Sequence, residues 1–220
     1  MTTLATGRGA ALWVVAAVGY LLLEAVAAAG FVPAYSYTRN YISDLGVDAG
    51  QLVHGRTFDS PRAYLIHIAF YLQGILFFLG ALLIVGTPES PRARLFLGLI
   101  TANSIGNIVI GTVHSGSVHR AGAALAIVGG NTAILAGSAV VATVGDWRWY
   151  RRISNLLAAL GLLSLLMLII NSATSAANLV ADGAWERGSV YSIILWQLVT
   201  AACLLSLPRE AARRASWPDS

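Results

Sequence analysis

The chain has 220 residues, of which 57% are hydrophobic and only 11% charged, and its mean hydropathy is +0.70. This balance excludes a soluble globular domain and indicates an integral membrane protein. The formal charge of +4 comes with arginines that stand at the ends of apolar segments, so no basic face for nucleic acid is expected. The single cysteine, Cys203, excludes a disulfide within the chain and a thiolate metal site.

Six apolar segments are each long enough to cross about 30 Å of hydrocarbon. They lie near residues 10–30, 63–86, 94–113, 121–145, 153–180 and 189–207. The connections are too short for a soluble domain, so we predict an all-α fold, a single six-helix transmembrane bundle over residues 1–220. Nine arginines border one side of this bundle and five the other. The positive-inside rule therefore places both termini in the cytoplasm and the protein in the cell membrane, which in a bacterium is the inner membrane.

The first apolar segment carries Glu24 about one helical turn from its outer end. A carboxylate in a membrane helix is costly unless it is paired or hydrated, so we expect a partner, either Arg120, Arg187 or a histidine. The segment also has the small-residue end "AVAAAG" of a signal peptide, and cleavage would leave five helices. Glu24 is unusual in a signal peptide, and we expect the helix to be retained.

The first outer connection, residues 31–62, is the longest in the chain. It contains Ser43 and Asp44 within "NYISDLG". A loop of this length and polarity is typical of a binding element or a lid. Asp44 could equally cap a turn before Gly46.

Amides recur on the predicted third and fifth helices. Asn103, Asn107 and His114 follow one another at spacings of four and seven, which places them on one helical face. Asn171 and Asn178 repeat the pattern in the fifth segment. These rows face either a water-filled cavity or neighbouring helices. The mid-helix amides Gln73, Asn131 and Gln197 favour hydrogen bonds between helices.

Two histidines, His114 and His119, stand in the short connection "GTVHSGSVHRAGA". The plain interpretation is a polar turn at the membrane surface. The alternative is a role in ligand contact or pH response, because histidine titrates near neutral pH.

Several short motifs occur in a recognisable order: "NYISDLG" at 40–46, "SPRA" at 60–63, "GTVHSGSVHRAGA" at 111–123, "GGN" at 129–131 and "ERGSVYSIILW" at 186–196. With them, nearly the whole chain resembles the bacterial and archaeal multi-pass membrane family known as domain of unknown function 998. "YISDLG" alone is also similar to a stretch of the Frag/DRAM/Sfk membrane proteins. The resemblance implies a six-helix bundle and supplies neither a reaction nor catalytic residues.

The outer side also carries a set of residues, Ser43, Asp44, His67, His114 and His119, that superficially resembles the inventory of seven-helix membrane hydrolases of the alkaline ceramidase and progestin-receptor type. Such enzymes hold zinc with neutral imidazoles. Their last helix carries an H-x-x-x-H pair, and the last helix here has no histidine. A serine nucleophile would need Ser43 or Ser115 beside an imidazole that a carboxylate orients. We therefore predict neither a metal ion nor a cofactor.

The function that these features favour is binding or transport of a lipid or small amphiphile in an outward-facing polar pocket beneath the loop 31–62. We expect Glu24, Asp44, Asn107 and His114 to converge on that pocket. The alternatives are an intramembrane hydrolase of a lipid-linked substrate and a structural subunit of an envelope complex. The expected partners are membrane lipid, another copy of the chain or an envelope complex, and no nucleic acid.

Overall fold

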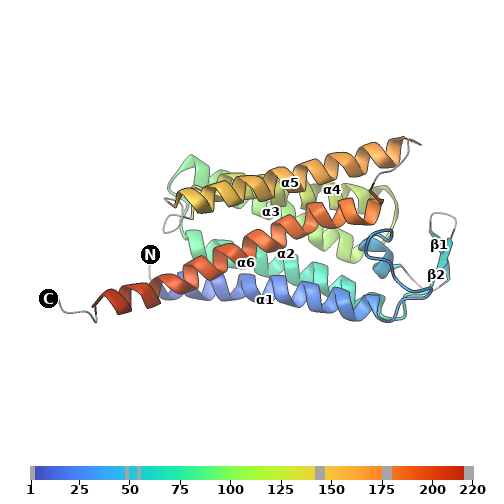
Figure 1. Ribbon diagram of the computed structural model, residues 1–220, viewed down its shortest axis with the longest axis horizontal. Helices are drawn as coiled ribbons and strands as arrows, with labels where there is room; N and C mark the ends of the chain where they lie inside the picture. Colours follow the sequence, from blue (N-terminus) through green and yellow to red (C-terminus); the bar gives the residue numbers. More distant parts are fainter. Residues whose placement is uncertain (1–2, 48–49, 54–55, 142–146, 175–179, 216–220) are drawn as a thin grey trace.

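The computed structural model describes residues 3–47, 50–53, 56–141, 147–174 and 180–215. Within these ranges the chain forms six long helices, arranged as one elongated bundle (Figure 1). They are α1 (Thr3–Ala28), α2 (Ala63–Val85), α3 (Pro91–Thr112), α4 (Gly116–Gly137), α5 (Arg148–Ala173) and α6 (Asp182–Ala215). The predicted all-α fold is confirmed.

Five of the described helices, α1, α2, α3, α5 and α6, are long and apolar enough to cross a membrane. The protein is therefore an integral membrane protein. Helix α4 is as long as α3, with 22 residues each. It falls outside the five, and its sequence contains the glycines and the asparagine of "GGN", which lower its hydropathy.

Two helix boundaries depart clearly from prediction, the start of α6 and the end of α4. Helix α6 begins at Asp182 and not near residue 189, because the charges of Asp182, Glu186 and Arg187 reduce the local hydropathy without breaking the helix. Both Glu186 and Arg187 are therefore helical. Helix α4 ends at Gly137, short of the predicted 145, and residues 142–146 and 175–179 lie outside the described part of the chain.

The connection between α1 and α2 is more ordered than a plain loop. It contains the short 3-10 helix η1 (Ser43–Gly46) and the strands β1 (Gln51–Val53) and β2 (Arg56–Phe58), which pair antiparallel. We call the end of the bundle that carries them the loop end. Both chain termini lie at the opposite end, which we call the terminal end (Figure 1).

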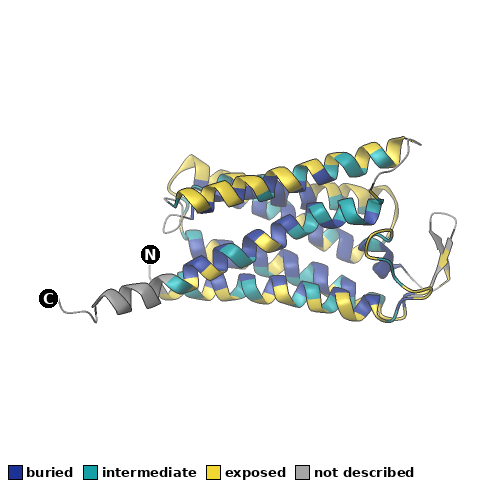
Figure 2. Ribbon diagram, viewed as in Figure 1, coloured by how far each residue is buried: buried dark blue, intermediate teal, exposed yellow. Residues whose placement is uncertain are grey.

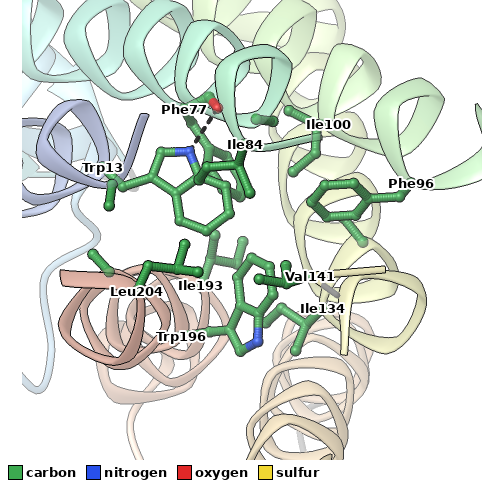
Figure 3. Close-up of a cluster of buried hydrophobic side chains, with 14 of the residues drawn as sticks. Trp13, Phe77, Ile84, Phe96, Ile100, Ile134, Val141, Ile193, Trp196 and Leu204 are labelled. Carbon is green, nitrogen blue, oxygen red and sulfur yellow. Dashed lines mark hydrogen bonds between the residues drawn. The ribbon is translucent and has the colours of Figure 1, made fainter. Parts of the chain in front are cut away.

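Consecutive helices are neighbours around the bundle, and α6 closes the ring by packing against α1 as well as α5. One core cluster brings together Trp13 of α1, Phe77 of α2 and Trp196 of α6 (Figure 3). Trp13 donates its indole N–H to the carbonyl of Phe77 at 2.9 Å. Buried residues face the bundle interior, whereas α5 is largely exposed along its outer face (Figure 2), as expected of a helix that faces lipid.

The side of the membrane that each end faces is a prediction from the arginine distribution. Reporter fusions after Pro88, after Trp149 and at the C-terminus should report cytoplasm, and fusions near Gly50 and Gly183 the outside. The opposite pattern would place the loop end in the cytoplasm and overturn the predicted orientation.

Candidate functional site

A buried ion pair joins α1 to α6 near the loop end. The Nη2 of Arg187 lies 3.0 Å from the Oε1 of Glu24, and both side chains are almost wholly buried. The hydroxyl of Tyr191 donates to the Oε2 of Glu24 at 2.8 Å. The pairing of Glu24 with Arg187, one of the alternatives predicted from the sequence, is confirmed.

Arg187 also holds the loop that follows α1. Its Nη1 donates to the carbonyls of Tyr37 and Asn40 at 2.7 and 2.8 Å. Its Nη2 donates to the hydroxyl of Tyr35, and the guanidinium stacks on the rings of Tyr35 and Tyr37, 5.3 and 4.9 Å from their centroids. Burial raises the pKa of the Tyr35 hydroxyl well above its ordinary value, so it keeps its proton and donates to the carbonyl of Tyr41 at 2.7 Å. One arginine thus fixes both a helix pair and the loop.

Asp44 acts as a cap of the turn at η1. Its Oδ2 accepts from the backbone N–H of Tyr41 at 2.9 Å and from the amide of Asn40 at 3.2 Å. This is the capping role that the sequence left open for Asp44. On the other side of the turn, Glu186 of α6 accepts the backbone N–H of Ile42. The turn is therefore anchored to α6 by a carboxylate as well as by Arg187.

A cavity opens beside this turn and extends into the bundle. The empty space between the wall atoms, with open solvent at the mouth included, is about 530 Å³. Most of the wall is apolar, from Ile42, Phe70, Ile110, Ala123, Ala126, Ile127, Val190, Ile193 and Ile194. The polar groups on the wall are Tyr20, Ser43, Gln73, Asn103, Asn107, His119 and Glu186.

The amides on the cavity wall are also engaged with protein. Asn103 donates to the carbonyl of Ala126 on α4 at 2.6 Å, and Asn107 donates to the carbonyl of Asn103 at 2.9 Å. Gln73 donates to the Oε1 of Gln197 at 2.6 Å, which joins α2 to α6. Its own Oε1 is buried and has no hydrogen-bond partner among the described residues.

The mid-helix amides make the predicted contacts between helices. Gln73 and Gln197 pair directly, and Asn131 of α4 donates to the carbonyl of Ser189 on α6 at 2.9 Å. The prediction for these three amides is confirmed.

The histidines take different positions. His119 lines the cavity and contacts the carbonyl of Val113 through its Nδ1 at 2.7 Å. His67 and His114 stack with ring centroids 3.7 Å apart, and the Nε2 of His67 lies 3.0 Å from the carbonyl oxygen of Gly46. The stack joins the start of α2 to the connection between α3 and α4, outside the cavity wall.

The predicted convergence of Glu24, Asp44, Asn107 and His114 is wrong, because only Asn107 lines the cavity. The carboxylate of Glu24 is bound by Arg187 and that of Asp44 by the turn, while His114 stacks on His67.

Of the other predicted site residues, some line the cavity and some lie elsewhere. Ser43, Asn103 and His119 line the cavity. Asn171 lies on α5, where it donates to the carbonyl of Val180 at 3.0 Å, and Asn178 lies outside the described residues.

Sequence reasoning missed Glu186, the carboxylate on the cavity wall. The available signal was an acidic residue directly before Arg187, which the prediction had placed in a connection and not in a helix. In the described part of the chain, no three His, Cys, Asp or Glu side chains gather in a way that could hold a metal ion.

The profile of a family described as protein of unknown function (DUF998) matches residues 11–203. The chain therefore belongs to this family. Neither a curated protein nor a solved structure matches it.

Proposed function

We propose that this member of the DUF998 family binds a small membrane amphiphile in the cavity beside η1, as a binding protein or as a step of transport. The observation that carries the proposal is a cavity within a membrane bundle whose wall is apolar for most of its area and interrupted by buried polar groups. An amphiphile has an apolar part and a polar part that match such a wall. Ligand sites generally combine apolar walls with a few polar groups at defined positions.

The depth of the cavity fits such an occupant. At about 1.5 Å per residue, Glu186 lies about 6 Å inside the start of α6, and Asn103 lies about 14 Å from the end of α3. The wall therefore runs from the loop end to near the middle of the bundle. The apolar side of the wall suits an acyl or alkyl chain, and the polar groups along the wall suit a head group.

The turn at η1 gives the cavity its outer rim. Ile42 and Ser43 line the wall, and the turn is tied to α6 through Glu186 and Arg187. An occupant would lie beneath a segment that hydrogen bonds hold in place, at the end of the bundle that we predict to face outside. This arrangement supports the predicted role of the loop 31–62 as part of a binding element.

Filling the cavity should remove the amphiphile. Ala123 of α4 is partly buried and lines the cavity, whereas its neighbour Ala124 is exposed on the same helix. In A123F the ring occupies the space of the ligand. We therefore expect native mass spectrometry of the mildly solubilised protein to find a bound amphiphile on the wild type and little on A123F.

The matched control is A124F, which adds the same ring toward the outside and should retain the amphiphile. Thermal unfolding of both variants checks that they are folded. An empty wild-type protein, or equal occupancy of the two variants, contradicts the proposal.

The hydrolase and scaffold alternatives receive no comparable support. Among the described residues, Ser43 makes no side-chain hydrogen bond to an imidazole, although it shares the cavity wall with His119. The Nδ1 of His119 contacts a backbone carbonyl and not a carboxylate, which is unlike the orientation of a catalytic base in a triad.

A further inference from the structure

We propose that the amphiphile carries a cationic head group with N–H donors, an alkylammonium in the simplest case, and that Glu186 is its counter-ion. This inference rests on the proposed function and names the class of ligand for the same cavity. It follows from the direction of the hydrogen bonds on the cavity wall and from the balance of charge there.

The amides on the wall turn their donors toward protein. The partners of Asn103 and Asn107 are backbone carbonyls, which only accept, so the NH₂ group of each amide must point to them. The Oδ1 of Asn103 accepts from the amide of Asn107 at 3.2 Å, whereas the Oδ1 of Asn107 is left for the cavity side. Among the described residues no donor reaches the Oδ1 of Asn107, and the Oε1 of Gln73 is buried without a partner.

His119 presents an acceptor for the same reason. Its Nδ1 must carry the proton to bond the carbonyl of Val113. In the neutral ring, the Nε2 is then the acceptor. The wall thus offers acceptors from an amide, an imidazole and a carboxylate, beside the hydroxyls of Tyr20 and Ser43, which can donate or accept. A ligand that donates hydrogen bonds is complementary to this set.

The charge on the wall has one sign. Among the described residues that line the cavity, Glu186 is the acidic one and none is an arginine. Its neighbour Arg187 is bound to Glu24 and to loop carbonyls. The carboxylate of Glu186 accepts the N–H of Ile42 at one oxygen, and in the described part of the chain its Oε1 has no donor. A carboxylate at this depth is costly unless it is paired, and a ligand ammonium supplies the missing pair.

The apolar walls distinguish the ligand from a bare cation. Phe70, Ile110 and Ile194 offer no oxygen to a metal ion and suit an alkyl chain. The acceptors and the carboxylate select the head group, and the apolar residues select the tail.

The test compares three probes with the same tail: octylammonium, octanol and octanoate. Radiolabelled probe is bound to the purified full-length protein at one micellar concentration, and the signal of A123F is subtracted as background. We expect the wild type to bind octylammonium roughly ten-fold or more tightly than octanol, because charge-assisted hydrogen bonds are the stronger ones, and octanoate most weakly.

The variant that tests Glu186 is E186Q, which keeps an oxygen to accept the N–H of Ile42. We expect it to lose roughly ten-fold or more in octylammonium affinity and much less in octanol affinity, so that the preference for octylammonium falls. The control is E89Q, the same change at an exposed position in the turn between α2 and α3. It should bind like the wild type.

The outcomes separate the two proposals. Equal binding of octylammonium and octanol, a preference for octanoate, or an unchanged preference in E186Q overturns the assignment of a cationic ligand while an occupied cavity still stands. If no probe binds the wild type above the A123F background, the proposed function fails as well. Should E186Q not fold, the ranking of the three probes on the wild type decides the question.

Discussion

The variant R187A should lower the free energy of unfolding by about 3–5 kcal/mol, the typical cost when one partner of a buried ion pair is removed. Glu24 would then remain buried on α1, with Tyr191 as its one remaining donor among the residues that the structure describes. The loop would lose the bonds from Arg187 to the carbonyls of Tyr37 and Asn40 as well. We expect a large fall in the thermal unfolding temperature of the detergent-solubilised protein.

The reverse variant, E24A, should cost less than R187A. Arg187 keeps its bonds to backbone carbonyls and to Tyr35 when Glu24 is absent, so its charge is still partly compensated. The double variant E24A/R187A removes both charges and should be less destabilised than the sum of the single variants. R187K separates charge from geometry, because an ammonium cannot reproduce the planar fork that spans Glu24 and the loop, so it should recover little.

Additive effects in this cycle would contradict a coupled pair. A stable R187A would show that the loop and α6 are held by other contacts.

The membrane bundle could be predicted because its signal is physical and local. A segment that crosses hydrocarbon must satisfy its backbone internally and present apolar side chains, and both requirements are visible in the sequence. The same cost argument led from Glu24 to a buried partner and to Arg187 as a candidate. The contacts made by Gln73, Asn131 and Gln197 could be predicted for the same reason.

The site could be predicted only in part. The free-energy cost of burying a polar group shows that the group needs a partner, but it does not show which residue that partner is. Asp44 is held locally by the turn that it caps, and His114 stacks on His67 of α2, outside the cavity wall. A residue held by such a partner does not reach the cavity, and the spacing of residues in the sequence does not reveal this. Glu186 was missed because low hydropathy made the predicted last helix begin only after it, near residue 189. The helix in fact includes this charged residue, whose carboxylate accepts the backbone N–H of Ile42 in the loop.

The close approach of α3 and α4 gives the second large effect. A Cβ at Gly106 would lie 2.4 Å from the backbone nitrogen of Ala126 and 2.6 Å from the carbonyl oxygen of Gly122, both on α4. Backbone atoms cannot turn aside as a flexible side chain can, so G106A must push the two helices apart. We expect a loss of about 1–3 kcal/mol in unfolding free energy, the usual cost of overpacking.

The matched control is G98A on the same helix. A Cβ at Gly98 meets nothing within 4 Å, so this variant should keep or slightly raise the unfolding temperature, since alanine favours a helix over glycine. The separation in G106A should also reach the cavity, because Asn103 holds the carbonyl of Ala126 at 2.6 Å and both residues lie on the wall. Octylammonium binding should therefore weaken in G106A and not in G98A. Equal unfolding temperatures for the two variants would mean that α3 and α4 are not in close contact at Gly106. The cavity wall that these two helices form would then be wrong.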